Sequence, residues 1–196
     1  MERLETELSG VWLVWPRVFA DPRGFFLESY NRRSMEQLGI HQSFVQDNHS
    51  RSGRGVLRGL HYQLGRPQAK LVRVTLGRVF DVVVDVRRGS PHFGRWTGHE
   101  LSADNHLMLF APEGFAHGFL VLSEVAEFQY KCSDFYAPAE ERAIAWDDPD
   151  LAIAWPLEGL EPLLSDKDLR APRLAEVPAG ELPVFSGSGT GSGSGG

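Results

Sequence analysis

The fold class is decided by two runs in the middle of the chain, Ala69-Lys-Leu-Val-Arg-Val-Thr75 and Val79-Phe-Asp-Val-Val-Val-Asp-Val86. The first run alternates between polar and apolar residues and stops at Gly77. The second is rich in valine and ends at the turn Arg88-Gly-Ser-Pro91. Alternation with period two and enrichment in β-branched residues are typical of β-strands. We therefore predict two consecutive strands here.

The sequence that follows continues the same pattern. A predicted strand over 106–110 stops at the turn Ala111-Pro-Glu-Gly114. The runs 115–122 and 125–131 are separated by two residues only, which predicts a hairpin. Many short strands without the spacing of βαβ units favour a barrel or a sandwich, and a jelly roll fits their number.

Helical signals are few. Asn31 can cap a short helix that runs through Leu38 and stops at Gly39. Ser165 can cap a further turn near Asp166–Leu169. The prediction is a mostly β protein with a few short helices.

Length and composition narrow the class of protein. We expect residues 1–184 to form one domain, large enough to bury a core without disulfides, and the Gly/Ser tract 185–196 to be a flexible tail or linker. The single cysteine, Cys132, suits a reducing compartment. The acidic first eight residues differ from a signal peptide, so a cytoplasmic protein is expected. The net charge of −6 argues against broad nucleic-acid binding but allows a small anionic ligand.

The densest polar segment is Arg58-Gly-Leu-His-Tyr-Gln63. His61 is a candidate general base because an imidazole titrates near neutrality, although a core histidine bonded to a carbonyl is an equally simple interpretation. Strict alternation puts Arg58 and His61 on opposite faces of a strand. Both reach one site only if Gly59 marks a bulge or a bend.

Four other residues have a functional and a structural interpretation. Lys70 faces the same way as neighbouring valines, where it needs an anion or a ligand unless it is a solvated edge residue. Tyr130 and His117 are either packed core residues or donors in a pocket. Asp168 either completes a capping box by reaching back to a backbone amide or orients His61.

A metal site is the main alternative for a small β-barrel. Metal-binding cupins carry a His-x-His pair on one strand with a carboxylate shortly after, and no His-x-His occurs in this sequence. Three of the other histidines, His99, His106 and His117, are too scattered to suggest a triad. We expect no metal.

Eight segments, taken in order between about residues 4 and 175, resemble one family. They are Asp21-Pro-Arg-Gly-Phe-Phe26 with Glu28, Gln46-Asp-Asn48, Arg58-Gly-Leu-His-Tyr-Gln63, Gln68-Ala-Lys-Leu-Val-Arg73, Phe80-Asp-Val-Val-Val-Asp85, Pro112-Glu-Gly-Phe-Ala-His-Gly-Phe119, Tyr130-Lys131 and Leu164-Ser-Asp-Lys-Asp168. Together they resemble the dTDP-4-dehydrorhamnose 3,5-epimerases of the route to dTDP-L-rhamnose.

The resemblance implies a cupin-type jelly roll, a homodimer that exchanges N-terminal strands, and no cofactor. It implies that His61 is the base, Asp168 its carboxylate partner, Tyr130 the acid on the other face of the sugar, and Lys70 the cation beside the enolate oxygen. The remaining implied substrate-binding residues are Arg23, Phe26, Glu28, Gln46, Asn48, Arg58, His117, Glu141 and Lys167. Among these, Arg23 and Glu28 are expected to reach the partner subunit's site.

Three other functions stay open at this point. One is an epimerase that inverts C3 alone, in another deoxysugar route. The second is a metal-dependent cupin oxygenase or isomerase. The third is a sugar-nucleotide binding module without catalysis on the same barrel.

Overall fold

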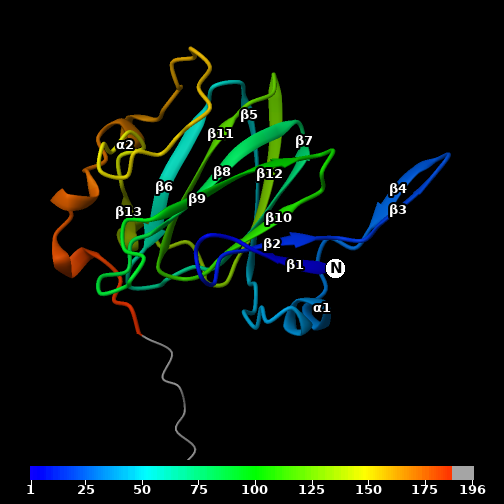
Figure 1. Cartoon of the computed structure of the whole chain (residues 1–196), viewed down its shortest axis with the longest axis horizontal. Helices are drawn as coiled ribbons and strands as arrows, with labels where there is room; N and C mark the ends of the chain where they lie inside the picture. The colour runs from blue at the N-terminus through cyan, green and yellow to red at the C-terminus, as the bar shows by residue number, and fades with distance from the viewer. Residues whose placement is uncertain (187–196) are drawn as a thin grey trace, which may run out of the picture.

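A computed structural model describes residues 1–186, and their strands form two sheets that face one another (Figure 1). The six-stranded sheet has the order β1 (Glu2–Glu5), β2 (Trp12–Trp15), β10 (Met108–Ala111), β7 (Lys70–Leu76), β12 (Val125–Cys132) and β5 (Gln46–Gly53). The five-stranded sheet has the order β13 (Glu141–Ala143), β6 (Leu57–Gln63), β11 (Phe115–Val121), β8 (Arg78–Asp85) and β9 (Trp96–Ser102). All these strand pairs are antiparallel, as a jelly roll requires.

The main core lies between the two sheets and follows the period-two pattern of the sequence. Val72 and Val74 of β7 and Val83 of β8 point into it. Phe119 of β11 and Phe128 of β12 meet at its centre, with ring centroids 4.1 Å apart and planes 16° apart. The two strands predicted from the runs 69–75 and 79–86 are therefore confirmed as β7 and β8. β7 belongs to the six-stranded sheet and β8 to the five-stranded sheet.

The predicted hairpin between residues 115–122 and 125–131 is wrong. The two strands exist as β11 and β12, but they belong to different sheets. Both edges of β11 are already paired, with β6 on one side and β8 on the other, so no edge is left for β12. The two connecting residues instead carry the chain across the sandwich, and this crossing allows Phe119 and Phe128 to stack.

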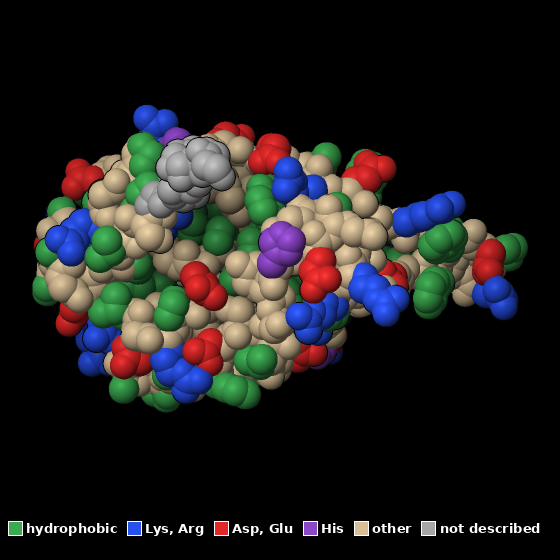
Figure 2. All heavy atoms as spheres, turned by 90° about the horizontal axis from the view of Figure 1, so that it is seen from below, with side chains coloured by type: hydrophobic (Ala, Val, Ile, Leu, Met, Phe, Trp, Pro, Cys, Tyr) green, Lys and Arg blue, Asp and Glu red, His purple; other side chains and the backbone are tan. Residues whose placement is uncertain are grey.

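A two-stranded arm leaves the body of the molecule near the N-terminus. It consists of β3 (Val18–Asp21) and β4 (Gly24–Leu27), which pair only with each other. Figures 1 and 2 show the arm extending well beyond the sheets. Its aromatic side chains are strongly exposed, at 51% for Phe19, 60% for Phe25 and 70% for Phe26. Exposed aromatic residues gathered on a projecting hairpin are typical of a surface that binds a protein partner.

The helices are short, as predicted. They are α1 (Arg32–Gln37), α2 (Asp166–Leu169), and the 3₁₀ turns η1 (Pro138–Glu140), η2 (Leu174–Glu176) and η3 (Ala179–Glu181). The predicted caps are confirmed, because the side chain of Asn31 accepts from Arg33 and that of Ser165 accepts from Asp168. The capping-box role of Asp168 is wrong, since its carboxylate bonds the Ser165 hydroxyl and His61 rather than a backbone amide.

The chain after β13 covers the outer face of the five-stranded sheet. Leu151, Trp155, Leu174, Val177 and Leu182 pack there in one cluster with valines of β8. Because α2 belongs to this covering segment, Asp168 is carried next to β6, the strand that pairs with the edge strand β13. No helix in residues 1–186 has the length and apolar character to cross a membrane. The expected tail, 185–196, lies outside the described residues from 187 onward, so its character stays a prediction.

Candidate active site

A bulge in β6 brings Arg58 and His61 to one site. His61 pairs with His117 of β11, whereas Arg58 pairs with Phe119, so three steps along β6 match two along β11. Gly59 lies inside this bulge with φ +112°, and a Cβ there would lie 2.6 Å from the Cα of Gly118. Only glycine fits such a close backbone approach. Of the two alternatives that the sequence left open at Gly59, a bulge or a bend, the structure has the bulge, and Arg58 and His61 line the same cavity.

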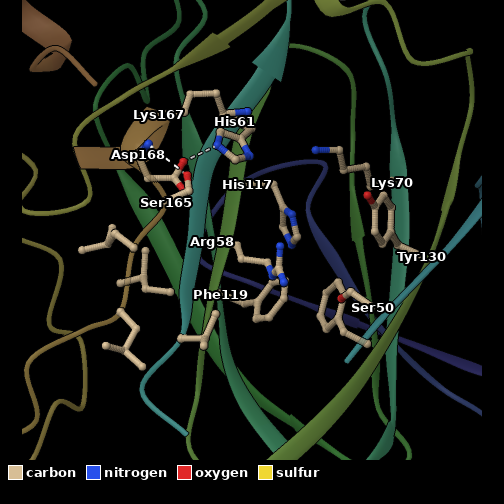
Figure 3. A pocket seen from close by; sticks show the side chains of 15 residues that line it. Ser50, Arg58, His61, Lys70, His117, Phe119, Tyr130, Ser165, Lys167 and Asp168 are labelled. Atoms are coloured by element: carbon tan, nitrogen blue, oxygen red, sulfur yellow. Dashed lines mark hydrogen bonds and ion pairs between the residues drawn. The ribbon is translucent and has the colours of Figure 1, made fainter. Parts of the chain in front are cut away.

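This cavity lies between the sheets and has a volume of about 460 Å³. His61 and Asp168 stand on one side of it, and Lys70 and Tyr130 on the other (Figure 3). The lining is completed by Ser50, Val56, Leu57, Arg58, His117, Phe119, Phe128, Leu163, Leu164, Ser165 and Lys167. The four residues expected to do chemistry thus come from four different elements and meet in one cavity.

The His61 imidazole is bonded to a buried carboxylate. Its Nε2 lies 2.6 Å from Oδ1 of Asp168, whose side chain is 4% exposed. Burial by itself would raise the pKa of Asp168, but the hydrogen bonds from His61 and Ser165 outweigh it, and the pKa of Asp168 lies below its ordinary value. Asp168 is therefore an ionised acceptor, which assigns the Nε2 proton to His61 and leaves Nδ1 as the ring nitrogen that does not bond Asp168.

Lys70 begins β7 and points inward beside Tyr130. The two strands pair so that Tyr130 faces Val72 and Cys132 faces Lys70, which makes Lys70 and Tyr130 diagonal neighbours on the inner face. Within residues 1–186 no carboxylate lies within 4.0 Å of the Lys70 ammonium group, so none of them forms an ion pair with it. Burial lowers the pKa of Lys70 below its ordinary value. A partly buried cation of this kind can stabilise negative charge that develops on a ligand.

Tyr130 occupies the opposite wall from His61. It packs beside Phe128, with ring centroids 6.0 Å apart. Burial raises the pKa of Tyr130, and nearby Arg58 opposes that shift. The phenol is therefore protonated at neutral pH, as a proton donor must be.

A second histidine–carboxylate pair adjoins the cavity, which only its histidine lines. His117 Nε2 is 2.9 and 3.0 Å from the two carboxylate oxygens of Asp81, which is fully buried. Arg58 reaches across to the other sheet and donates to Ser52 Oγ from Nε and Nη2, at 3.3 and 3.1 Å. These bonds fix the Arg58 and His117 side chains where they line the cavity.

A second cavity of about 360 Å³ adjoins the first and shares His61, Lys70 and Tyr130 with it. Gln46, Asn48 and Glu141 line this second cavity. Glu141 accepts from Lys167 at 2.8 Å and from the Tyr136 hydroxyl at 3.0 Å, and lies 4.0 Å from His61 Nδ1. Burial would raise the pKa of Glu141, but Lys167 and His61 lower it below its ordinary value.

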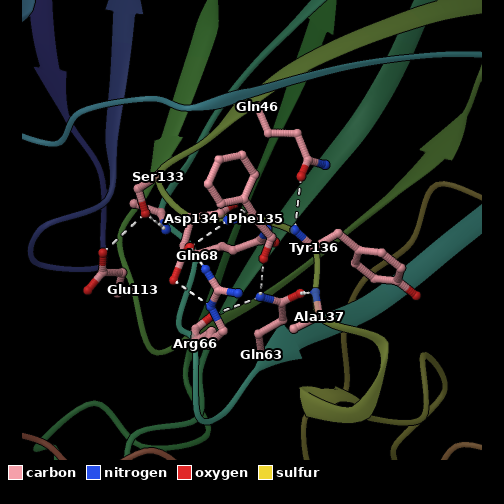
Figure 4. A network of polar contacts seen from close by, with 11 residues as sticks. Gln46, Gln63, Arg66, Gln68, Glu113, Ser133, Asp134, Phe135, Tyr136 and Ala137 are labelled. Carbon is pink, nitrogen blue, oxygen red and sulfur yellow. Dashed lines mark hydrogen bonds and ion pairs between the residues drawn. The ribbon is translucent and has the colours of Figure 1, made fainter.

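The loop that carries Tyr136 is held by amide side chains (Figure 4). Gln46 accepts from the Tyr136 amide at 2.9 Å, and Gln63 accepts from the Ala137 amide at 2.8 Å. Gln68 donates to the Asp134 carbonyl at 2.8 Å. These contacts give the glutamines of the sequence motifs a structural role at the wall of the second cavity.

Three of the expected binding residues lie away from both cavities. Arg23 and Phe26 are on the arm, where Arg23 bonds Asp21 at 2.6 Å. Glu28, just after β4, accepts from Asn31 and Ser34. Within one chain these residues do not meet the site, and their expected role at a partner's site stays a prediction.

Sequence reasoning missed several residues that bond the site's side chains, and Asp81 and Ser165 are the two closest to the expected chemistry. Asp81 was not singled out, although a carboxylate within the apolar run 79–86 is an unusual residue for a central strand and needs a partner. Ser165 was interpreted only as a helix cap, yet its hydroxyl also donates to Asp168. No group of three His, Cys, Asp or Glu side chains in residues 1–186 is arranged to hold a metal ion. The expected absence of a metal stays a prediction.

Fold and site together define a cupin-type jelly-roll protein of the sugar-nucleotide epimerase class, with a histidine–carboxylate pair facing a tyrosine and a partly buried lysine. The sequence pattern of the dTDP-4-dehydrorhamnose 3,5-epimerase family matches residues 5–176. The chain belongs to this family of isomerases.

Individual proteins with names from this family are similar to the chain in sequence and in structure. A dTDP-4-dehydrorhamnose 3,5-epimerase of Pseudomonas aeruginosa is 59% identical over 178 residues, which cover 90% of this chain and 98% of the relative. The crystal structure of a Legionella pneumophila dTDP-6-deoxy-D-glucose-3,5-epimerase, in complex with dTDP-4-keto-L-rhamnose, matches with TM-score 0.91 and 49% identity over 94% of this chain and 98% of that one. A 3′-monoepimerase from Streptomyces bikiniensis, in complex with dTDP-quinovose, matches with TM-score 0.86 and 40% identity over 91% of each chain.

Proposed function

We propose that the protein inverts C3 and C5 of dTDP-4-dehydro-6-deoxy-D-glucose to give dTDP-4-dehydro-L-rhamnose, in dTDP-L-rhamnose biosynthesis. Family membership supports the substrate and the reaction. The observation that carries the proposal is the placement of His61 and Tyr130 on opposite walls of one cavity, with Lys70 beside the tyrosine.

The chemistry follows from the 4-keto group. A proton on C3 or C5 is acidic because the carbanion left behind delocalises onto the C4 oxygen as an enolate. His61 accepts this proton at Nδ1 and becomes an imidazolium, which Asp168 stabilises through Nε2. Tyr130 then donates its phenolic proton to the same carbon from the opposite face, and the enolate returns to the ketone with inverted configuration. His61 then releases its proton to solvent and Tyr130 regains one from solvent, which restores the base and the acid before the second carbon reacts.

Lys70 has the role of stabilising the enolate. Its ammonium group has no carboxylate partner in residues 1–186, so its charge is available to the C4 oxygen. A preorganised cation favours charge that exists mainly in the transition state and lowers the barrier. Arg58, His117, Gln46, Asn48, Glu141 and Lys167 are proposed as contacts of the nucleotide sugar.

We also propose a homodimer in which the arms are exchanged, so that Arg23, Phe26 and Glu28 complete the partner's site. The exposed aromatic side chains of the arm support this, because such surface is seldom left in water. A cytoplasmic location is proposed as well, in keeping with a single free cysteine, Cys132.

Inversion at C3 alone is the second candidate, and the likeness to a 3′-monoepimerase favours it. Incubation of the 4-keto-6-deoxy sugar nucleotide in deuterated water separates the two. Deuterium at both C3 and C5, with an L-rhamno product, is the result expected of a double epimerase. Deuterium at C3 alone would establish the single inversion. A protein that binds the sugar nucleotide but incorporates no deuterium would be a binding module without catalysis.

A further inference from the structure

Both oxygens of the Asp168 carboxylate have their own donor. Oδ1 faces His61 Nε2 at 2.6 Å, and Oδ2 accepts from the Ser165 hydroxyl at 2.7 Å. The same hydroxyl oxygen accepts from the backbone amide of Asp168 at 3.3 Å. Ser165 therefore bonds one residue twice, once as the cap of α2 and once as a donor to its carboxylate.

We infer that Ser165 is a positioning residue, which holds the Asp168 carboxylate in the rotamer that orients His61. This inference rests on the proposed function of His61 as the base. It assigns to the hydroxyl a role beyond that of a helix cap, since a cap needs only an oxygen that accepts.

The burial of Asp168 makes this second bond necessary. The side chain is 4% exposed, and a buried carboxylate oxygen without a donor is costly. In residues 1–186 the Ser165 hydroxyl is the only hydrogen-bond donor to Oδ2. Without the Ser165 hydroxyl, the carboxylate lowers its free energy by turning toward another donor or by taking up a proton. Either change weakens its hydrogen bond to His61.

The helix itself has other anchors. Lys167 of α2 bonds Glu141 of β13 at 2.8 Å, and the amide of Leu169 donates to the Ser165 carbonyl at 3.0 Å. Loss of the Ser165 hydroxyl should therefore leave α2 on the sheet and free mainly the carboxylate. The expected defect is a misoriented imidazole in a folded protein.

Four substitutions separate the cap from the donor. Ser165→Thr keeps both functions, and Ser165→Ala removes both. Ser165→Asp caps a helix as well as serine does but has no proton to donate at neutral pH. Ser165→Gly removes the donor without adding charge and weakens the cap only slightly.

The first measurement is steady-state epimerisation, with dTDP affinity and urea unfolding as controls. We expect Ser165→Thr to retain wild-type kcat, and the other three variants to lose about 10- to 100-fold in kcat, the scale of a charge-assisted hydrogen bond. KM and dTDP affinity should change little. Wild-type kcat in Ser165→Asp or Ser165→Gly would reduce Ser165 to a cap and overturn the inference.

A second measurement does not need turnover. The Nε2 proton of His61, bonded to Asp168, should give a downfield resonance in the proton NMR spectrum, assigned by its absence in His61→Asn. We expect the resonance in the wild type and in Ser165→Thr, and its loss or upfield shift in Ser165→Ala. An unchanged resonance in Ser165→Ala would sink the inference. Absence of proton exchange in the wild type would instead contradict the proposed function alone.

Discussion

Asp168 Oδ1 lies 2.6 Å from His61 Nε2, although the two residues are 107 positions apart in the chain. His61 stands on β6 within a sheet, whereas Asp168 stands on a four-residue helix in the segment that covers the sheet's outer face. The pair therefore forms only when this segment has packed. Protonation of the Asp168 carboxylate should therefore change the free energy of unfolding of the whole fold.

The first prediction concerns this linkage. A carboxyl whose pKa is lowered by folding contributes stability above its ordinary pKa, about 3.9 for Asp, and loses that contribution as the pH falls through the native value. We expect the urea-unfolding free energy of the wild type to fall over this acid range more steeply than that of Asp168→Asn. Asp104→Asn, at an exposed turn, is the matched control and should follow the wild type. Parallel curves for wild type and Asp168→Asn would refute the linkage.

Tyr130→Phe removes one hydroxyl from the wall opposite His61. General acid catalysis contributes typically about 10²–10⁴-fold, so the rate of inverted product formation should fall by that order. Affinity for dTDP should stay within a factor of about two, because the ring remains in place. Tyr30→Phe, which removes the same group at a tyrosine packed against Phe44 outside the cavities, should be as active as the wild type. Product formation is followed by proton NMR, and a fully active Tyr130→Phe would rule out the tyrosine as the acid.

Lys70→Met tests the partly buried cation. Loss of a preorganised charge at a developing oxyanion costs about 10²–10³-fold in kcat. Because burial lowers the pKa of Lys70, the native state disfavours its charged form, and the variant should be at least as stable as the wild type at neutral pH. The control is Lys131→Met, where the lysine is bonded to Asp47 instead. Urea unfolding measures the stability and initial rates measure kcat. A Lys70→Met variant that is less stable than the wild type but fully active would contradict both expectations.

The exchanged arms can be tested by complementation. Arg23→Ala should impair a partner's site and His61→Asn the chain's own site, so each variant alone should be nearly inactive. In a mixture that has been unfolded and refolded together, half the dimers are mixed and each contains one intact site, so about one quarter of wild-type activity should return. Light scattering verifies the dimer. If the mixture stays as inactive as its components, the arm does not complete the partner's site.

The local sequence was enough to predict the strands over 69–75, 79–86, 106–110, 115–122 and 125–131, and to name chemistry that individual residues could perform. Period-two alternation indicated β7, β8 and the inward faces of Lys70 and Tyr130, because side-chain direction in a strand depends only on local geometry. The position of Gly59 between Arg58 and His61 indicated a bulge or a bend, since strict alternation puts the two side chains on opposite faces of the strand.

Which strands are neighbours and which side chains meet depends on long-range packing, which became visible in the three-dimensional structure. The two residues between β11 and β12 look like a hairpin turn locally, but pairing on both edges of β11 turns them into a crossing between sheets. The second role of Ser165 and the partner of His117 were hidden for the same reason. Hydrogen bonds between residues distant in sequence depend on how the sheets and their covering segment pack, and no local pattern encodes that packing.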